Sequence, residues 1–118
     1  MVYLLTDNIL FSSKIVQNLK GHGVEVKTFI SPDAMDATIG QDQPLAILIN
    51  LNAQKYEPAT VIRNLKAKGS PAALVAFCGH SDRETYAKGE EAGADRIVAN
   101  SAITMNARQA LRDAGVDV

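Results

Sequence analysis

The segment from Leu45 to Ala53 reads LAILINLNA, an apolar run that ends in polar residues. Its first part, Leu45–Ile49, is continuously apolar, which is typical of a strand buried on both faces of a sheet. Asn50 and Asn52 follow directly. In a chain that alternates strands and helices, residues after such a strand lie at the carboxyl edge of the sheet, where ligands bind and reactions occur. This edge therefore presents amides where acid chemistry would need a carboxylate.

Similar apolar runs occur five times, and a stretch with helical spacing or helix-start signals follows each of them. The expected strands are Val2–Thr6, Val24–Ile30, Leu45–Asn50, Ala72–Phe77 and Arg96–Ala99. The expected helices are about Asn8–Lys20, Ser31–Ile39, Pro58–Ala67, Ser81–Gly93 and Thr104–Ala114. Ser31 before Pro32, and Ser81 three residues before Glu84, predict helix starts with a hydroxyl as the N-cap.

Five strand-then-helix units require crossover connections, so the strands are expected to be parallel with helices on both faces. This is a doubly wound α/β sandwich of three layers. Val24–Ile30 alternates apolar and polar residues, as an edge strand does, whereas the first, third and fourth strands are apolar. The strand order 2-1-3-4-5 fits best, and residues 1–118 are expected to form a single domain.

The composition excludes several classes of protein. The 118 residues are 47% hydrophobic and 21% charged with a net charge of −1, which suits an ordinary soluble domain and gives no basic block for nucleic acid. No apolar run approaches the roughly 20 residues that span a bilayer, and MVYLLTD is too short for a signal peptide. We therefore expect a cytoplasmic protein without a membrane partner. The single cysteine, Cys78, excludes an internal disulfide and a cysteine-cluster metal site.

Four stretches, taken in order, resemble the receiver domain of bacterial two-component response regulators. They are LLTDN at Leu4–Asn8, ILINLN at Ile47–Asn52, AFCGHSDRET at Ala76–Thr85 and EAGADRIVANS at Glu91–Ser101. Gly-Ala-Asp before a short strand is a recurrent receiver signature, and the resemblance covers essentially the whole chain. It implies the CheY-like, flavodoxin-like (βα)5 fold.

The family resemblance also implies where a phosphorylation site would lie. In receivers an acidic pair and an aspartate ending the third strand hold Mg²⁺, and that aspartate accepts the phosphoryl group. A hydroxyl after the fourth strand and a lysine after the fifth then bind the phosphoryl oxygens. The matching positions here are Asp7, Asn8, Asn50, Cys78 and Asn100. Only Asp7 keeps the residue type of the family.

These replacements predict that the phosphorylation chemistry is absent. The amide nitrogen of Asn50 shares its lone pair with the carbonyl and is not a usable nucleophile, and one carboxylate is a poor Mg²⁺ site. Without Mg²⁺ and the lysine, nothing offsets the charge of a transferring phosphoryl group. Only Lys55 could substitute as a cation. We expect a degenerate receiver that is not an enzyme and uses no metal or cofactor. Its Asp7 would accept hydrogen bonds from Asn8, Asn50 and Asn100, or simply cap a loop.

A phosphorylation-independent receiver would act by binding a protein. The resemblance points to the face of the fourth helix, fifth strand and fifth helix, roughly Ser81–Ala114, with another signalling protein or a second copy as partner. The candidate contact residues are Tyr86, Ile97, Ile103, Met105 and Arg108. Core packing is the alternative role for each apolar member, above all for Ile97.

Two other functions stay open from the sequence. The first is a flavodoxin-like regulatory domain that binds a small molecule, although DNILFSS, residues 7–13, lacks the Ser/Thr/Gly phosphate loop of a flavodoxin. The second is an enzyme that uses Asp7 or Cys78, for which no paired acid and base is apparent. The chain could be a free-standing adaptor or one part of a larger regulator.

Overall fold

Five parallel strands form the centre of the computed structural model, which describes residues 1–118. Their order is β2-β1-β3-β4-β5, as the sequence predicted. The strands are β1 (Val2–Leu5), β2 (Val26–Phe29), β3 (Ala46–Asn50), β4 (Ala73–Cys78) and β5 (Arg96–Ala99). The helices are α1 (Ile9–Gly21), α2 (Pro32–Asp42), α3 (Pro58–Ala67), α4 (Arg83–Ala92), α5 (Asn100–Met105) and α6 (Ala107–Asp113).

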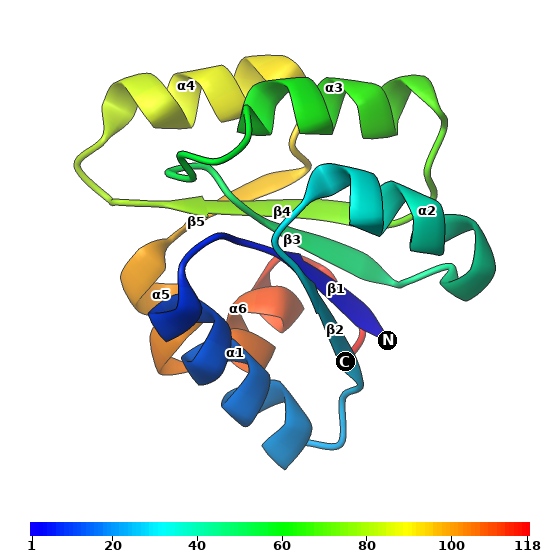
Figure 1. Cartoon of the computed structure of the whole chain (residues 1–118). Coiled ribbons are helices and arrows are strands. Elements are labelled where there is room, and N and C mark those ends of the chain that lie inside the picture. Colours follow the sequence, from blue (N-terminus) through cyan, green and yellow to red (C-terminus); the bar gives the residue numbers. More distant parts are fainter.

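The helices form two layers, with α2, α3 and α4 on one face of the sheet and α1, α5 and α6 on the other (Figure 1). Alternate residues of the central strands point into opposite layers. Tyr3 and Leu5 of β1 belong to the apolar cluster beneath α2–α4, whereas Val2 and Leu4 belong to the cluster beneath α1, α5 and α6. All four are fully buried. This explains why the central strands read as continuous apolar runs.

The strand register brings two segments that are distant in sequence to the same edge. Leu5 at the end of β1 pairs with Ile49 of β3, and Asn50 pairs with Phe77 of β4. The chain reverses its direction of winding between β1 and β3, which is the switch point expected for this strand order. The residues after β1 and β3 therefore face each other across the carboxyl edge of the sheet.

The C-terminal helix differs from the prediction of one helix over Thr104–Ala114. Helix formation begins earlier, at Asn100, and the region is divided into α5 and α6 because Asn106 leaves helical geometry with φ −153° and ψ 86°. The Asn106 side chain accepts a hydrogen bond from the N–H of Gln109 and thereby starts α6. Asparagine competes with the backbone for such bonds, so it favours caps over helix interiors.

Two other helix boundaries also moved. The N-cap of α4 is Asp82 rather than Ser81, since the Asp82 carboxylate accepts the N–H of Thr85 at 3.2 Å. Helix α2 continues to Asp42, past the predicted end at Ile39. None of the six helices combines the length and the apolar character that crossing a membrane requires.

Gln43 gives a direct test of the local geometry. It ends α2 in the left-handed conformation with φ 50°, which costs any residue that carries a Cβ. We expect Gln43→Gly to raise the free energy of unfolding by about 0.5–1 kcal/mol, measured by urea denaturation. The matched variant Gln41→Gly, inside α2, is expected to lower it by about 0.5 kcal/mol. Equal effects of the two variants would contradict the assigned end of α2.

Candidate functional site

The side chain of Asn50 is buried at the end of β3, with only 2% of the residue exposed. Its Nδ2 donates to Oγ1 of Thr6 at 3.0 Å, and its Oδ1 accepts the N–H of Asn52 at 2.9 Å. Oγ1 of Thr6 also accepts the N–H of Asn8 at 3.1 Å. The amide of Asn50 therefore connects the residues after β1 to the loop after β3, and both of its polar atoms take part in the fold.

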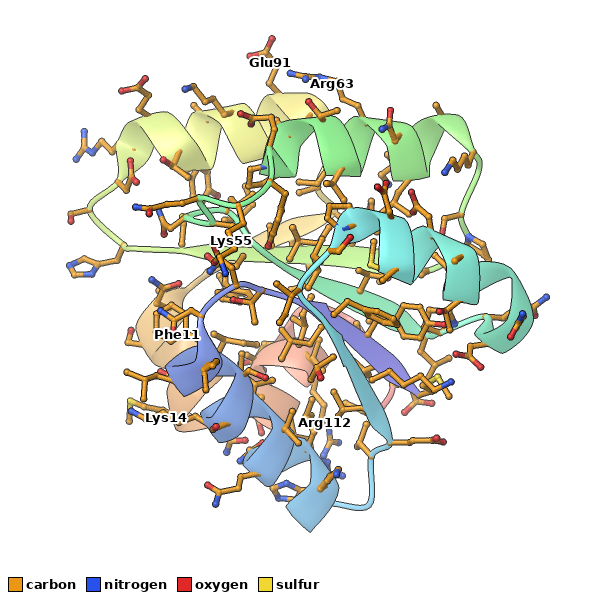
Figure 2. All side chains as sticks on the ribbon, viewed as in Figure 1. Phe11, Lys14, Lys55, Arg63, Glu91 and Arg112 are labelled. Carbon is orange, nitrogen blue, oxygen red and sulfur yellow. The ribbon has the colours of Figure 1, made fainter.

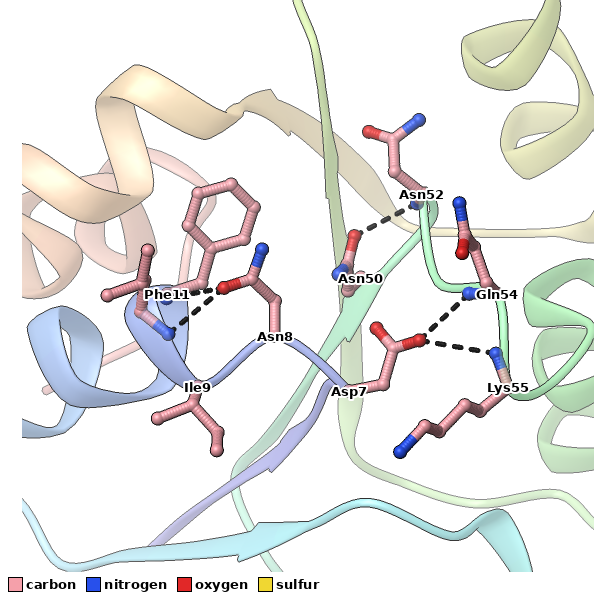
Figure 3. Close-up of a pocket in the computed structure, with 9 residues that line it drawn as sticks. Asp7, Asn8, Ile9, Phe11, Asn50, Asn52, Gln54 and Lys55 are labelled. Carbon is pink, nitrogen blue, oxygen red and sulfur yellow. Dashed lines mark hydrogen bonds between the residues drawn. The ribbon is translucent and has the colours of Figure 1, made fainter.

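Asp7 interacts with the same loop, but through backbone groups. Its Oδ2 accepts the N–H of Gln54 at 2.9 Å and that of Lys55 at 3.2 Å (Figure 3). The expected hydrogen bonds from Asn8, Asn50 and Asn100 to this carboxylate are not formed. Oδ1 of Asn8 instead accepts the N–H groups of Leu10 and Phe11, as the N-cap of α1. Asp7 thus has the role of a loop-capping carboxylate.

Tyr56 anchors the loop between β3 and α3 to the ends of two strands, a role that the sequence did not predict. Its hydroxyl donates to the carbonyl oxygen of Leu5 at 2.9 Å and, more weakly, to that of Asn50 at 3.3 Å. Burial and the charge of Asp7 raise the pKa of Tyr56 far above its ordinary value. The hydroxyl keeps its proton and remains a donor at neutral pH. The loop between β3 and α3 is therefore bonded to both strands of the switch point.

Asn52 joins this loop to the next one, between β4 and α4. Its Oδ1 accepts the N–H of Gly79 at 3.0 Å, and its Nδ2 donates to Oδ2 of Asp82 at 3.0 Å. We call this pair of hydrogen bonds the Asn52 bridge. Hydrogen bonds from the side chain and the backbone N–H of Thr85, and a smaller contribution from Asn52, hold the pKa of Asp82 below its usual range. The ionised Asp82 carboxylate therefore contributes its full stabilisation above about pH 4, the pKa of an aspartate in the unfolded chain. This stabilisation is lost as the pH falls through the lower pKa of Asp82 in the folded chain.

A cavity of about 560 Å³ opens beside these residues. Three of the predicted site residues line it, namely Asp7, Asn8 and Asn50. Its wall is completed by Ile9, Leu10, Phe11, Asn52, Gln54 and Lys55. Cys78 and Asn100 do not line the cavity.

The donor set of the cavity does not fit Mg²⁺, the metal of receiver phosphorylation. Asp7 is the one carboxylate present, and one of its oxygens already accepts two backbone N–H groups. The side-chain oxygens of Asn8 and Asn50 also accept backbone N–H groups. Mg²⁺ requires near-octahedral oxygen ligands and favours carboxylates, so binding here would have to break these bonds.

The two remaining predicted residues lie apart from the cavity. Cys78 ends β4 with 2% exposure, and burial, with a smaller contribution from Asp82, raises the pKa of its thiol. A buried thiol that keeps its proton behaves as a small apolar side chain. Asn100 begins α5, and its Oδ1 is buried without a hydrogen-bond partner. The position that matches the lysine of receivers therefore carries an amide that forms no hydrogen bond with Asp7.

Comparison with solved structures identifies the fold. The chain superposes on the signal receiver domain of a response regulator from Bermanella marisrubri with a TM-score of 0.84 at 16% identity, covering 97% of this chain and 96% of that one. The superposition on a receiver domain from Bacteroides fragilis has a TM-score of 0.79 at 20% identity, and it covers 99% of this chain and 97% of that one. The superposition on the receiver domain of NtrX from Brucella abortus has a TM-score of 0.77 at 17% identity, and it covers 95% of this chain and 98% of that one.

This is the receiver-domain fold. No protein-family model matches the chain, and no curated protein matches it at the level of sequence. The structural neighbours are nevertheless receiver domains over nearly their full length. The receiver fold places Asp7, Asn8 and Asn50 at the edge where β1 and β3 end, as the sequence predicted for the strand order.

The residues predicted for a docking face have different environments. Tyr86 is 44% exposed and Met105 is 82% exposed. Ile103 is fully buried in the core beneath α1, so its assignment to a surface was wrong. Ile97 is partly buried, and its Cδ1 lies 3.2 Å from where a Cβ on Gly89 would be. Arg108 is partly buried on α6 and donates from Nε to the carbonyl oxygen of Val118 at 3.3 Å.

The Asn52 bridge predicts the local stability of the loop between β4 and α4. In Asn52→Ala the N–H of Gly79 loses its acceptor, so its amide hydrogen should exchange about fivefold faster, as expected for a lost bond worth about 1 kcal/mol. Asn64→Ala, an exposed change on α3, serves as the control and should leave the exchange of Gly79 unchanged. Unaltered protection of Gly79 in Asn52→Ala would show that the bridge does not hold this loop.

Proposed function

We propose that this chain is a receiver-like domain that signals by binding a protein and does not accept a phosphoryl group. The observation that carries the proposal is the bonding of Asn50. At the position of the phospho-accepting aspartate, the structure has a buried amide whose two polar atoms are already bonded to Thr6 and Asn52. An amide has no anionic oxygen with which to attack phosphorus, so the first step of receiver chemistry lacks its nucleophile.

The neighbouring groups support the same conclusion. Asp7 is bonded to the loop after β3, and Asn100 presents an amide where a cation would bind the phosphoryl oxygens. A transferring phosphoryl group needs its charge offset by a metal or by cationic side chains. Lys55 is the one cation that lines the cavity.

The bonds around the site also favour a single conformation. Tyr56 joins the loop after β3 to the ends of β1 and β3, and the Asn52 bridge joins that loop to the start of α4. A Cβ on Gly89 would come within 2.7 Å of Leu51, so α4 packs closely on the residue that follows Asn50. We infer that the surface is presented to a partner in one state, without a phosphorylation-dependent switch.

A small-molecule site is the second candidate. The cavity of about 560 Å³ falls within the range of ligand pockets, which hold about 300–1,000 Å³. A nucleotide or flavin that raised the melting temperature of the chain would favour this alternative.

The proposal predicts the outcome of incubation with a phosphodonor. With acetyl phosphate and Mg²⁺, intact-mass measurement is expected to show no adduct of about 80 Da, because no carboxylate is available at position 50. A receiver domain with its aspartate, treated in parallel, shows that the donor is active. Asn50→Asp restores the carboxylate alone and is expected to acquire at most a trace of the adduct, since Asn8 and Asn100 are unchanged. A stoichiometric adduct on the unsubstituted chain would contradict the proposal.

A further inference from the structure

A second cavity lies at the amino edge of the sheet, between the ends of α2 and α3. Helix α2 leads into β3 and α3 leads into β4, and Figure 1 shows these two connections on the same side of the molecule. Lys55, labelled in Figure 2, lines the cavity of Asp7 before the start of α3, whereas the second cavity lies beyond the end of that helix. The ten residues of α3, about 15 Å of helix, therefore separate the two cavities.

The floor of the second cavity is apolar. Leu65 of α3 and Ala72 before β4 are buried there, and so is Pro44. Ile39 and Pro71 complete the apolar part of the wall. The volume of about 300 Å³ is at the lower end of the range of ligand pockets, so a single ring or a short branched chain fits this floor.

Three polar side chains line the same cavity, and each can donate a hydrogen bond. The side chain of Gln43 is exposed and has no partner in the chain, and Oγ of Ser70 accepts the N–H of Ala72 but donates to no group. Nζ of Lys68 lies 3.5 Å from Asp36, in an exposed ion pair of little strength. No aspartate or glutamate lines the cavity. Three donors without a carboxylate among them are complementary to an anionic oxygen of a ligand.

Two residues of the wall are unfavourable for folding. Gln43 is left-handed with φ 50°, where glycine is preferred, and strain of this kind persists mainly at functional sites. Gly40 lies within α2, where glycine is less favourable than alanine, yet no atom lies within 4 Å of the place where its Cβ would be. Packing therefore does not require glycine at position 40, and the missing side chain leaves the cavity open.

We propose that this cavity binds a small carboxylate with an apolar body, such as an aromatic or branched-chain acid. The apolar body lies against Leu65, while Lys68, Ser70 and Gln43 donate to the carboxylate. The ligand replaces the distant carboxylate that now pairs with Lys68. The inference goes beyond the proposed function and does not depend on it, because the cavity lies at the opposite edge of the sheet from Asn50.

Titration of the ¹⁵N-labelled chain with three probes of nearly equal shape tests the inference. Phenylacetate is expected to shift the amide signals of residues 39–44 and 65–72. Phenylacetamide should bind at least about fivefold more weakly, because a neutral oxygen forms a weaker bond with Lys68, and 2-phenylethylamine should not bind. Equal binding of the three probes, or shifts that centre on residues 7–11 and 50–55, would overturn the proposal. The absence of any shift up to about 10 mM phenylacetate, beyond the millimolar Kd of a weak ligand, would also overturn it.

Substitution of Lys68 assigns the charge recognition. Lys68→Met removes the cation, keeps an apolar stem and should raise the Kd of phenylacetate at least about fivefold, because a charge-assisted bond is lost. Lys88→Met is the matched control, since Lys88 also lies 3.5 Å from a carboxylate, and it should leave the Kd unchanged. The dispersed spectrum of each variant reports its folding. An unchanged Kd in Lys68→Met would refute the role of this lysine.

Gln43→Gly separates a role in binding from a role in structure. The variant relieves the left-handed strain, so its midpoint of urea unfolding should rise, as stated above. Its Kd for phenylacetate should nevertheless rise about threefold, because one donor is lost. A higher midpoint with an unchanged Kd would show that Gln43 does not bind the ligand. The mass measurement with acetyl phosphate is independent of these results, so either proposal can fail without the other.

Discussion

The amide of Asn50 is the group on which the arrangement of the site depends. It is buried at the end of β3 and bonds in two directions, to Thr6 after β1 and to the N–H of Asn52 in the following loop. A carboxylate at this position would accept the N–H of Asn52 but could not donate to Thr6, and its charge would need a metal or a cation in place of water. An amide satisfies both bonds without any added ion.

The bonds around Asn50 explain why the edge of the sheet behaves as a connected unit. Tyr56 and Asp7 attach the loop after β3 to β1, and the Asn52 bridge attaches it to α4. The side chains of Asp7, Asn8 and Asn50 therefore already have partners within the chain, whereas Oδ1 of Asn100 has none. At the start of α1, Ile9 and Leu10 are exposed, and they line the same cavity as Lys55.

The sequence predicted the strand order because buried parallel strands read as apolar runs and the edge strand β2 alternates. It also located Asp7, Asn8 and Asn50 at one edge. It could not identify the partners of Asp7, which are backbone N–H groups 47 and 48 residues away and have no side-chain signature. The roles of Thr6 and Tyr56 were missed for a related reason, since they depend on loop geometry. Asn52 was placed at this edge, but its bonds to Gly79 and Asp82 were not predicted. Ile103 was misplaced because an apolar residue in a short helix fits a core and a surface equally well.

Addition of Mg²⁺ and beryllofluoride, a phosphoryl mimic, tests the account most directly, with the amide NMR spectrum as the readout. Because position 50 has a bonded amide and Asp7 is the one carboxylate of the cavity, the mimic has no carboxylate to join at position 50 and the metal has a poor site. The account predicts an unchanged amide spectrum at concentrations of Mg²⁺ and beryllofluoride that saturate a receiver domain with its aspartate. Shifts that cluster on Asp7, Asn50 and the start of α4 would contradict it.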